Sequence, residues 1–275
     1  MFTIIAKKKI APEGYFLRIN APQIARKARP GQFLILRVHE KGERIPLTLV
    51  NWSRSRGYID IAFQVVGKST YLLSKKNPGE SLPDVLGPLG HPSKIEKVGT
   101  IAFLAGGFGA AAILPIAKAM KRKGNRILTV LGARNRDYLI FEKELSRVSH
   151  RIVITTDDGS KGIQGFVKDG LEVLVREEKI DLAYCIGPAI MMKFTSLETA
   201  RLGIPTIASL NPIMVDGTGM CGSCRVEVAG KTYFACVEGP EFDAHEVNWD
   251  LLLTRLNYYR EEEILAYEST IKQEI

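Results

Sequence analysis

Residues 100–112 read TIAFLAGGFGAAA, an apolar run followed by a glycine-rich turn and a series of small residues. The apolar part predicts a buried strand over Thr100–Leu104, and Ala110–Lys123 predicts the helix that follows. Between them, residues 107–112 match the pattern G-x-G-x-x-A, directly after Gly106. Such glycines let the backbone approach a pyrophosphate, which then lies at the N-terminus of the helix. The stretch therefore predicts a nucleotide-binding strand–turn–helix unit.

The same alternation of strand and helix continues through residues 97–210. Strands are predicted at Thr100–Leu104, Arg126–Leu131, Arg151–Thr156, Leu182–Ile186 and Thr206–Leu210, and further helices near Gly165 and at Ala189–Leu202. Five strands alternating with helices predict a doubly wound parallel sheet, an α/β fold. Such sheets bind ligands at the carboxyl ends of their strands. The residues expected there are Gly106, Gly107, Gly109, Asp157, Asp158, Gly159, Ser160, Cys185, Gly187 and Pro188.

Two of these groups have a simpler interpretation. Asp157 and Asp158 could cap a helix, and Cys185 could be a small buried apolar side chain, the commonest state of a free cysteine. The acidic residue expected at the end of the second strand, where a ribose hydroxyl is usually bound, is absent. Arg134 and Arg136 occur there instead, so the choice between NAD and NADP stays open.

Residues 1–96 show a different pattern of short strands separated by glycine and proline. Strands are predicted at Thr3–Ile10, Gly14–Ile19, Gln32–Val38, Leu47–Val50, Tyr58–Val66 and Ser81–Val85. Six strands of this length and spacing are typical of a small antiparallel β-barrel.

Two loops of this barrel carry groups that suit a phosphate-bearing cofactor. Residues 44–48 combine the Arg44 guanidinium, which matches phosphate oxygens, with the Thr48 hydroxyl, which can hydrogen-bond a ring nitrogen. Residues 67–70 offer backbone N–H groups and hydroxyls at the start of a short helix, a typical anion site. Each loop taken alone could equally be a solvated surface segment.

Three of the four cysteines lie together in residues 211–242. Cys221 and Cys224 form a C-x2-C pair in a glycine-rich loop, Cys236 follows, and Asp216 stands where plant-type [2Fe–2S] sites carry their first cysteine. Asp216, Cys221, Cys224 and Cys236 are therefore the expected ligands of a [2Fe–2S] cluster in a small loop subdomain. A structural zinc site and ordinary buried thiols are the alternatives.

Composition and the C-terminal segment limit the remaining possibilities. The chain has 275 residues and a formal charge of +8, but no basic run interleaved with aromatic residues, so we expect no nucleic-acid partner. The longest apolar stretch is broken by glycines and Pro115, so no membrane span is expected, and the few cysteines favour the cytoplasm. Within residues 243–275, apolar spacing predicts a helix over Asp243–Arg260 that packs on its own domain or docks a partner, followed by an exposed or partner-bound charged tail.

The order barrel, nucleotide domain, cluster loop resembles the ferredoxin–NADP reductase superfamily. The resemblance is carried by residues 44–48, 106–109, 185–188 and 216–236. Within it, the chain is similar to dihydroorotate dehydrogenase electron-transfer subunits. It resembles still more the small subunits of NADH-dependent reduced ferredoxin:NADP oxidoreductase, whose cluster loop begins with aspartate.

The resemblance implies FAD in the barrel, with Arg44 on its pyrophosphate and Thr48 by the flavin N5 edge. FAD contacts are implied for Pro46, Leu47, Val66, Gly67, Ser69 and Thr70 as well. No general acid is needed, and Thr48 and Cys185 are the nearest candidates to the reacting atoms.

The implied activity is that of an electron-transfer flavoprotein subunit. Electrons would pass between NAD(H), or NADP(H), FAD and the [2Fe–2S] cluster, and then to a larger flavin and iron–sulfur subunit in a heterodimer. That subunit would serve ferredoxin in an electron-bifurcating transhydrogenase. The alternatives are the electron-transfer subunit of dihydroorotate dehydrogenase and, from another class, a zinc-stabilised nucleotide-binding regulator.

Overall fold

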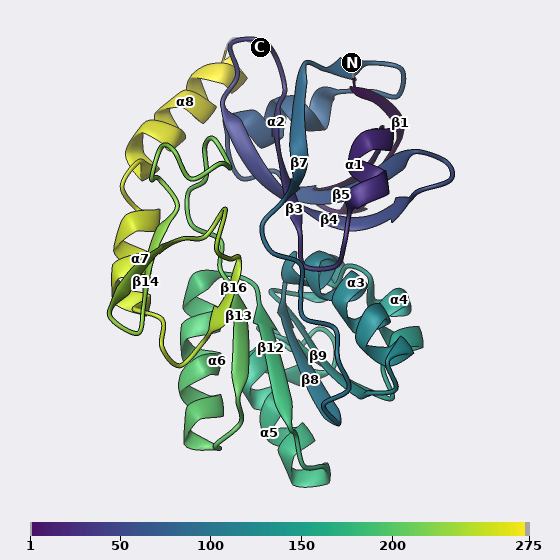
Figure 1. Ribbon diagram of the computed structural model, residues 1–275, viewed down its shortest axis with the longest axis vertical. Coiled ribbons are helices and arrows are strands. Elements are labelled where there is room, and N and C mark those ends of the chain that lie inside the picture. The colour runs from purple at the N-terminus through teal and green to yellow at the C-terminus, as the bar shows by residue number, and fades with distance from the viewer. Residues whose placement is uncertain (1, 273–275) are drawn as a thin grey trace.

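A β-barrel and an α/β layer lie end to end in the computed structural model, which describes residues 2–272 (Figure 1). The C-terminal segment runs back along one side from the α/β layer to the barrel. The last helix of the chain therefore lies beside the barrel, which the first residues form.

The barrel is a nearly closed antiparallel sheet of seven strands. Its strand order is β6-β1-β2-β5-β4-β3-β7, with β1 Phe2–Ala11, β2 Gly14–Asn20, β3 Phe33–Arg37, β4 Arg44–Ser53, β5 Tyr58–Gln64, β6 Ser81–Leu82 and β7 Asp84–Leu89. The prediction of six strands was wrong because residues 81–89 form two strands. Pro83, which has no N–H to donate to a ladder, separates β6 on β1 from β7 on β3.

Alternating side chains fill the barrel. Leu17 and Ile19 of β2 and Ile59 and Ile61 of β5 are fully buried, as the period of two in a strand requires. Asp60 is buried as well, where it accepts two hydrogen bonds from the Arg18 guanidinium. Two short helices, α1 Pro22–Lys27 and α2 Lys68–Lys75, belong to this unit.

The second sheet is parallel except at one edge. Its order is β11-β10-β9-β8-β12-β13-β16, with β8 Thr100–Gly106, β9 Arg126–Ala133, β10 Arg151–Thr156, β11 Ile163–Gln164, β12 Leu182–Ile186, β13 Thr206–Ser209 and β16 Glu241–Asp243. The five predicted strands are present, but the count of five was too low. β11 is only two residues long, and β16 pairs antiparallel with β13 from a distant segment.

Helices cover both faces of this sheet (Figure 1). Side chains of α3 and α4 pack on one face, and those of α5 and α6 on the other. Their bounds are α3 Gly109–Arg122, α4 Glu142–Val148, α5 Val167–Glu177 and α6 Ala189–Arg201, with a 3-10 turn η1 at Arg136–Tyr138. The predicted doubly wound arrangement is therefore present.

The C-terminal segment differs from the prediction of one helix over Asp243–Arg260. Asp243 ends β16, and the helices are α7 Trp249–Leu256 and α8 Arg260–Lys272. α7 begins late because Asn248 caps it, its Oδ1 accepting from the Leu251 N–H at 3.1 Å. The end of the predicted tail, residues 273–275, lies outside the described residues.

The predicted cluster loop, residues 211–242, precedes α7 and contains a hairpin. The hairpin consists of β14 Arg225–Val228 and β15 Lys231–Phe234, joined antiparallel. Val226, Cys224 and Cys236 are buried in the same core as α7 and the α5–α6 face of the sheet. The loop is thus fixed to the α/β unit by apolar packing.

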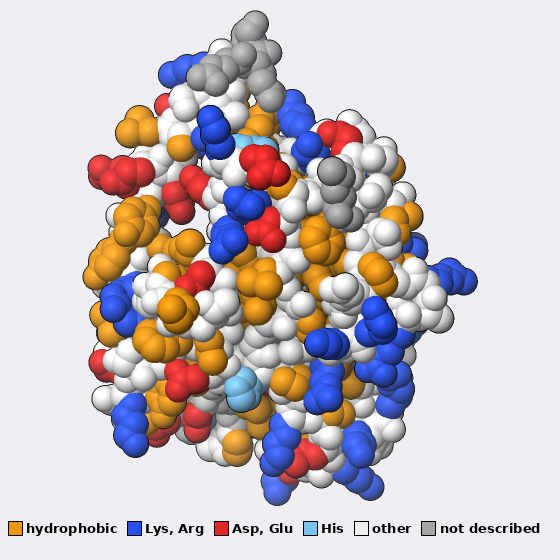
Figure 2. Space-filling model, turned by 45° about the horizontal axis from the view of Figure 1, so that its top comes forward, with side chains coloured by type: hydrophobic (Ala, Val, Ile, Leu, Met, Phe, Trp, Pro, Cys, Tyr) orange, Lys and Arg blue, Asp and Glu red, His pale blue; other side chains and the backbone are white. Residues whose placement is uncertain are grey.

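The surface carries its charges unevenly. Figure 2 shows basic side chains mainly on the side where α3 and α4 lie, whereas apolar side chains gather along the edge formed by α7 and α8. Tyr258, Tyr259 and Leu265 are among the exposed apolar residues of that edge. None of the helices within residues 2–272 combines the length and apolar character needed to cross a membrane.

Candidate functional site

A cavity of about 680 Å³ lies between the barrel and the α/β sheet. It is lined by Pro46, Leu47 and Thr48 of β4 and by the carboxyl ends of the parallel strands. Of the predicted site residues, those that line it are Pro46, Leu47, Thr48, Gly106, Gly107, Gly109, Asp157, Gly187 and Pro188. The two predicted halves of the site therefore face one cavity, as the strand-end rule requires.

The glycine-rich turn is shaped for a close backbone approach. A Cβ added at Gly109 would fall 2.0 Å from the Ile186 carbonyl oxygen, so no other residue fits between α3 and the end of β12. Gly107 has φ 52° and open space where its Cβ would point. The turn thus presents bare backbone at the N-terminus of α3, as pyrophosphate binding requires.

The floor of the cavity contains sulfur. Met191 lies along Gly106 and Gly187, where an added Cβ would meet its Cε at 2.5 and 2.3 Å. Cys185 lies beneath this floor, fully buried, with its Sγ 3.9 Å from the Met191 Sδ. Burial raises the pKa of the Cys185 thiol to about 12. Cys185 therefore does not line the cavity, and the interpretation as a small buried side chain describes it better than a role at the reacting atoms.

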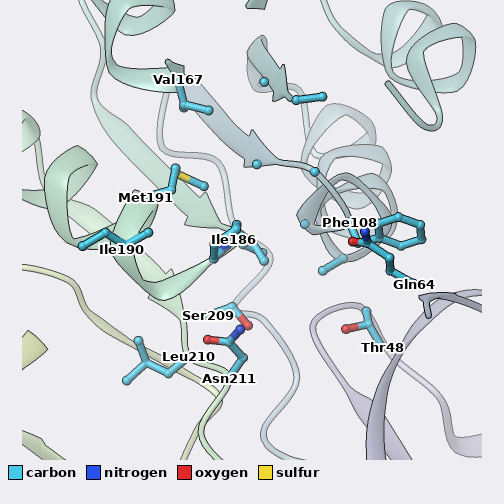
Figure 3. A pocket seen from close by; sticks show the side chains of 18 of the residues that line it. Thr48, Gln64, Phe108, Val167, Ile186, Ile190, Met191, Ser209, Leu210 and Asn211 are labelled. Atoms are coloured by element: carbon cyan, nitrogen blue, oxygen red, sulfur yellow. The ribbon is translucent and has the colours of Figure 1, made fainter. Parts of the chain in front are cut away.

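Four polar side chains face each other across the cavity. Figure 3 shows Ser209 and Asn211, from the end of β13, on one side and Thr48 and Gln64, from the barrel, on the other. None of the four makes a side-chain hydrogen bond within residues 2–272, so their donors and acceptors are free for a ligand. Sequence reasoning found Thr48 but missed the other three, although Asn211 directly follows a predicted strand.

A fifth polar group points to a ligand more strongly. The Thr155 hydroxyl, in β10, is buried without a hydrogen-bond partner among the described residues, and Thr155 lines the cavity. Buried hydroxyls nearly always find a partner. Arg134 also lines the cavity, with its guanidinium 5.3 Å from the Tyr138 ring centroid. Thr155 was missed because the predicted site began two residues later.

The residues expected to bind the FAD phosphates do not line this cavity. Arg44 pairs with Asp84 at 3.1 Å, and Ser69 donates to Glu43 at 2.8 Å. The Thr70 hydroxyl accepts from the N–H groups of Val66, at 2.9 Å, and Gly67, at 3.1 Å. These residues are gathered at the start of α2, but their polar groups are engaged with one another and with carboxylates.

The loop after β10 is only partly in the cavity. Asp157 lines it, whereas Asp158, Gly159 and Ser160 form a turn that does not. Hydrogen bonds from Ser160 lower the pKa of the Asp158 carboxyl, and the Ser160 hydroxyl accepts from the Arg136 N–H at 2.9 Å. This hydrogen bond holds the turn after β10 against the segment that follows β9.

Asp216 and Cys221 form one half of the cluster loop. The Asp216 carboxylate accepts from the N–H groups of Thr218, at 2.8 Å, and Cys221, at 2.6 Å. These bonds, Thr218 first, lower the pKa of Asp216 and keep it ionised. Cys221 lies at the surface, and its partial burial alone would raise the pKa of its thiol. Hydrogen bonds from Ser223 outweigh this effect, so the pKa of Cys221 is lowered. Both groups are thus suited to bind metal as anions.

Cys224 and Cys236 form the other half. Their sulfurs lie 3.2 Å apart in the core, and burial together with the neighbouring Cys224 raises the pKa of Cys236 to about 12. Within residues 2–272, no three His, Cys, Asp or Glu side chains converge on one point as a single metal ion would need. The four expected ligands thus form two pairs, Asp216 with Cys221 and Cys224 with Cys236, which would suit a two-iron cluster.

A family model supports this interpretation of the loop. Residues 211–248 match the iron–sulfur cluster binding domain of dihydroorotate dehydrogenase B. All four expected ligands lie inside the matched range.

Comparison with curated proteins extends the match to the whole chain. A protein of Thermotoga maritima named dihydroorotate dehydrogenase B (NAD(+)), electron transfer subunit homolog, is 51% identical over 269 residues, covering 98% of this chain and 95% of the relative. The subunit of Desulforamulus reducens is 33% identical and covers 90% and 97%. The chain belongs to the family of dihydroorotate dehydrogenase B electron transfer subunits.

Solved structures share the fold of this chain. A chain from a structure of NADH-dependent reduced ferredoxin–NADP oxidoreductase, a study of flavin-based electron bifurcation, matches with a TM-score of 0.94 and 49% identity over 98% of both chains. A ferredoxin NADP+ reductase from Neisseria gonorrhoeae shares the fold, with a TM-score of 0.61 and 17% identity over 74% of this chain and 90% of that one.

The predicted resemblance is therefore confirmed for the two kinds of electron-transfer subunit, and the ferredoxin–NADP reductases share the fold. The prediction of an oxidoreductase subunit for electron transfer is confirmed at the level of the family. A zinc-stabilised regulator is not supported, because the matched domain is an iron–sulfur one.

Proposed function

We propose that this chain passes electrons between NAD(H), FAD and a [2Fe–2S] cluster, and from the cluster to a larger partner subunit. The observation that carries the proposal is the single cavity that joins the Gly107–Gly109 turn to Thr48. One chain thus holds a dinucleotide turn, a ring-sized space and, in residues 216–236, two pairs of metal ligands.

The cavity residues orient two planar rings. When bound, the two groups would supply hydride transfer between nicotinamide and flavin, and the protein would contribute mainly by positioning them. Thr48 and Gln64 hold the polar edge of the flavin from the barrel side. Ser209 and Asn211, at the end of β13, would hydrogen-bond the nicotinamide end from the sheet side, with the apolar floor excluding water. Thr155, on β10 and separated from β13 by three strands, would contact another part of the nucleotide.

Each segment of the chain is assigned one of the remaining cofactor contacts. Residues 1–96 form the FAD domain, in which Arg44, Val66, Gly67, Ser69 and Thr70 bind the FAD phosphates once Arg44 leaves Asp84 and Ser69 leaves Glu43. Residues 97–210 bind the nicotinamide nucleotide, with Asp157–Ser160 beside it. Residues 211–242 would hold the cluster, and in the C-terminal segment 243–275 the helices α7 and α8 lie along one side of the molecule.

The Asp216 carboxylate and the Cys221, Cys224 and Cys236 thiolates are the cluster ligands. The cluster supplies one-electron chemistry when bound. The loop backbone fixes Asp216 through Thr218 and Cys221, so the carboxylate is already oriented and ionised.

The partner is a larger flavin and iron–sulfur subunit of a bifurcating ferredoxin:NADP oxidoreductase, which itself meets ferredoxin. Exposed apolar residues support a docked partner. Met220 in the cluster loop is 87% exposed, and Tyr258 and Leu265 lie on the α7–α8 edge. Asp216 and the 49% identity to the ferredoxin–NADP oxidoreductase chain favour this partner. The curated relatives favour a second candidate, electron transfer for dihydroorotate oxidation.

Chemical analysis of the purified chain tests the proposal. We expect one FAD and two atoms each of iron and acid-labile sulfide per copy of this chain when it is expressed alone under anaerobic conditions. Zinc in place of iron, or a chain that binds no flavin, contradicts it. In a separate experiment, identification of the large subunit that copurifies with this chain from its native cells separates the two candidates.

A further inference from the structure

A second cavity, of about 270 Å³, borders the cluster loop on the side of α7. Its lining contains Cys221, Gly222, Ser223, Arg225, Arg255, Tyr258 and Tyr259, together with Pro212, Ile213, Leu252 and Leu256. Two guanidinium groups border it and no carboxylate does. The α7 residues have no part in the electron path described above.

Arg255 reaches the cluster loop from α7. Its Nη2 donates to the Ser223 carbonyl oxygen at 3.2 Å, and Ser223 stands between the predicted ligands Cys221 and Cys224. The guanidinium also lies over the Tyr258 ring, 5.6 Å from its centroid. Arg255 therefore holds the carbonyl at the centre of the C-x2-C segment.

The charge of Arg255 is not neutralised by the protein. No carboxylate within residues 2–272 forms an ion pair with it, and its Nε is buried without a hydrogen-bond partner among the described residues. A half-buried guanidinium without a counter-ion is costly unless something nearby carries negative charge. The adjoining loop carries four anionic ligands when a cluster is bound.

The helix that presents Arg255 is firmly fixed. Trp249 is buried and donates its indole N–H to the Ala244 carbonyl at 3.0 Å, and Asn248 ties the helix start to Glu227 at 2.8 Å. Arg225 also lies near the loop, since an added Cβ at Gly222 would be 3.7 Å from its Nη1. Arg225 is exposed, however, so solvent screens its charge more strongly.

We propose that Arg255 is a positioning residue of the cluster site whose positive charge raises the reduction potential of the cluster. The inference rests on the proposed function, because it needs a cluster in residues 216–236. One-electron reduction makes the cluster more negative by one charge. A fixed cation beside it stabilises the reduced state more than the oxidised state.

Potentiometric titration followed by EPR tests this in the Arg255→Gln, Arg255→Lys and Arg225→Gln variants of the full chain. We expect a more negative cluster midpoint in Arg255→Gln. Arg255→Lys keeps the charge, so its midpoint should stay close to that of the wild type. Arg225→Gln should shift the midpoint less than Arg255→Gln does. An unchanged midpoint in Arg255→Gln, or equal shifts in Arg255→Gln and Arg255→Lys, overturns the inference.

The Arg255→His variant keeps the test decisive if Arg255→Gln loses its iron. Histidine loses its charge as the pH rises from about 5.5 to about 8. The midpoint of this variant should then fall further than that of the wild type over the same range, and equal pH dependence overturns the inference. Failure of the proposed function looks different, because the wild-type chain would then contain no iron or sulfide.

Discussion

Asp216 is the residue that most distinguishes this cluster loop from an all-cysteine one. Its carboxylate accepts two backbone hydrogen bonds inside the loop and is thereby held ionised next to Cys221. An oxygen ligand is harder and less covalent than a thiolate of the same charge, so as the proposed ligand Asp216 would change the electronic balance of its iron.

Substitution of Asp216 separates its two roles. Asp216→Ala removes a ligand and both loop hydrogen bonds, and we expect iron and sulfide per flavin to fall to about half or less of the wild-type value. Asp216→Cys should retain the cluster but change its midpoint potential. Iron analysis and EPR titration measure both effects. Full iron content in Asp216→Ala, or a wild-type midpoint in Asp216→Cys, would contradict these roles.

Glu241 is the second residue with an unusual environment. It lies at the junction of the two units, where the Ser93 hydroxyl donates to its Oε1 and an added Cβ at Gly31 would come within 2.9 Å of that oxygen. Burial raises the pKa of Glu241 from 4.5 to about 7. Between these values the native state holds a proton that the unfolded chain has lost, so stability falls as the pH rises through this window.

Glu241→Gln should remove that dependence. At pH 8 we expect the variant to be more stable than the wild type by on the order of 2 kcal/mol, and below pH 4.5 the difference should vanish. Urea unfolding at both pH values measures it, with the exposed Glu246→Gln as the matched control. A stability difference that does not vary with pH would show that Glu241 is ionised in the native state.

At the scale of elements, the turn between β8 and α3 is the tightest part of the site. Gly109→Ala would drive a methyl group into the Ile186 carbonyl, so the end of β12 must move. We expect a loss of stability on the order of 2 kcal/mol and at least about tenfold weaker nucleotide binding. Thermal unfolding and NADH titration measure these effects.

Gly67→Ala serves as the contrast for stability. Gly67 has an extended backbone, φ −171°, and no atom within 4 Å of an added Cβ. Its stability should stay near that of the wild type. If Gly109→Ala were as stable as Gly67→Ala and bound NADH normally, the close-approach argument would fail.

The strongly periodic elements could be predicted from the sequence, whereas those defined by long-range pairing could not. Strands such as Thr100–Gly106 and Arg151–Thr156 carry continuous apolar runs, and their neighbours follow from the βαβ pattern. β16, by contrast, exists only because Phe242 meets Ala208 across the sheet edge. In the prediction, Glu241 and Phe242 therefore belonged to the cluster loop and Asp243 to the start of a helix.

The candidate site shows the same division. Gly107, Gly109 and Thr48 belong to motifs with local spacing, so they could be found from the sequence. Gln64 and Asn211 reach the cavity only because the barrel lies against the sheet. Cys185 was placed at the site by its motif, but the backbone of β12 turns its side chain into the core.

At the scale of the whole molecule, three units are arranged so that one chain can hold all parts of an electron path. The cavity lies between barrel and sheet, and β13 leads from its edge directly into residues 211–236. Asn211 thus lines the cavity and also begins the matched iron–sulfur domain. Because Asn211 and Met214 line the cavity and Asp216 follows two residues later, we expect electrons to pass from a bound nucleotide to the cluster without a partner.

EPR of the isolated chain, frozen after anaerobic addition of NADH, tests that claim most directly. We predict the signal of a reduced [2Fe–2S] cluster, absent before NADH is added, from the chain without its partner subunit. A cluster that dithionite reduces but NADH does not, in a protein with its full FAD content, would contradict an electron path through this chain.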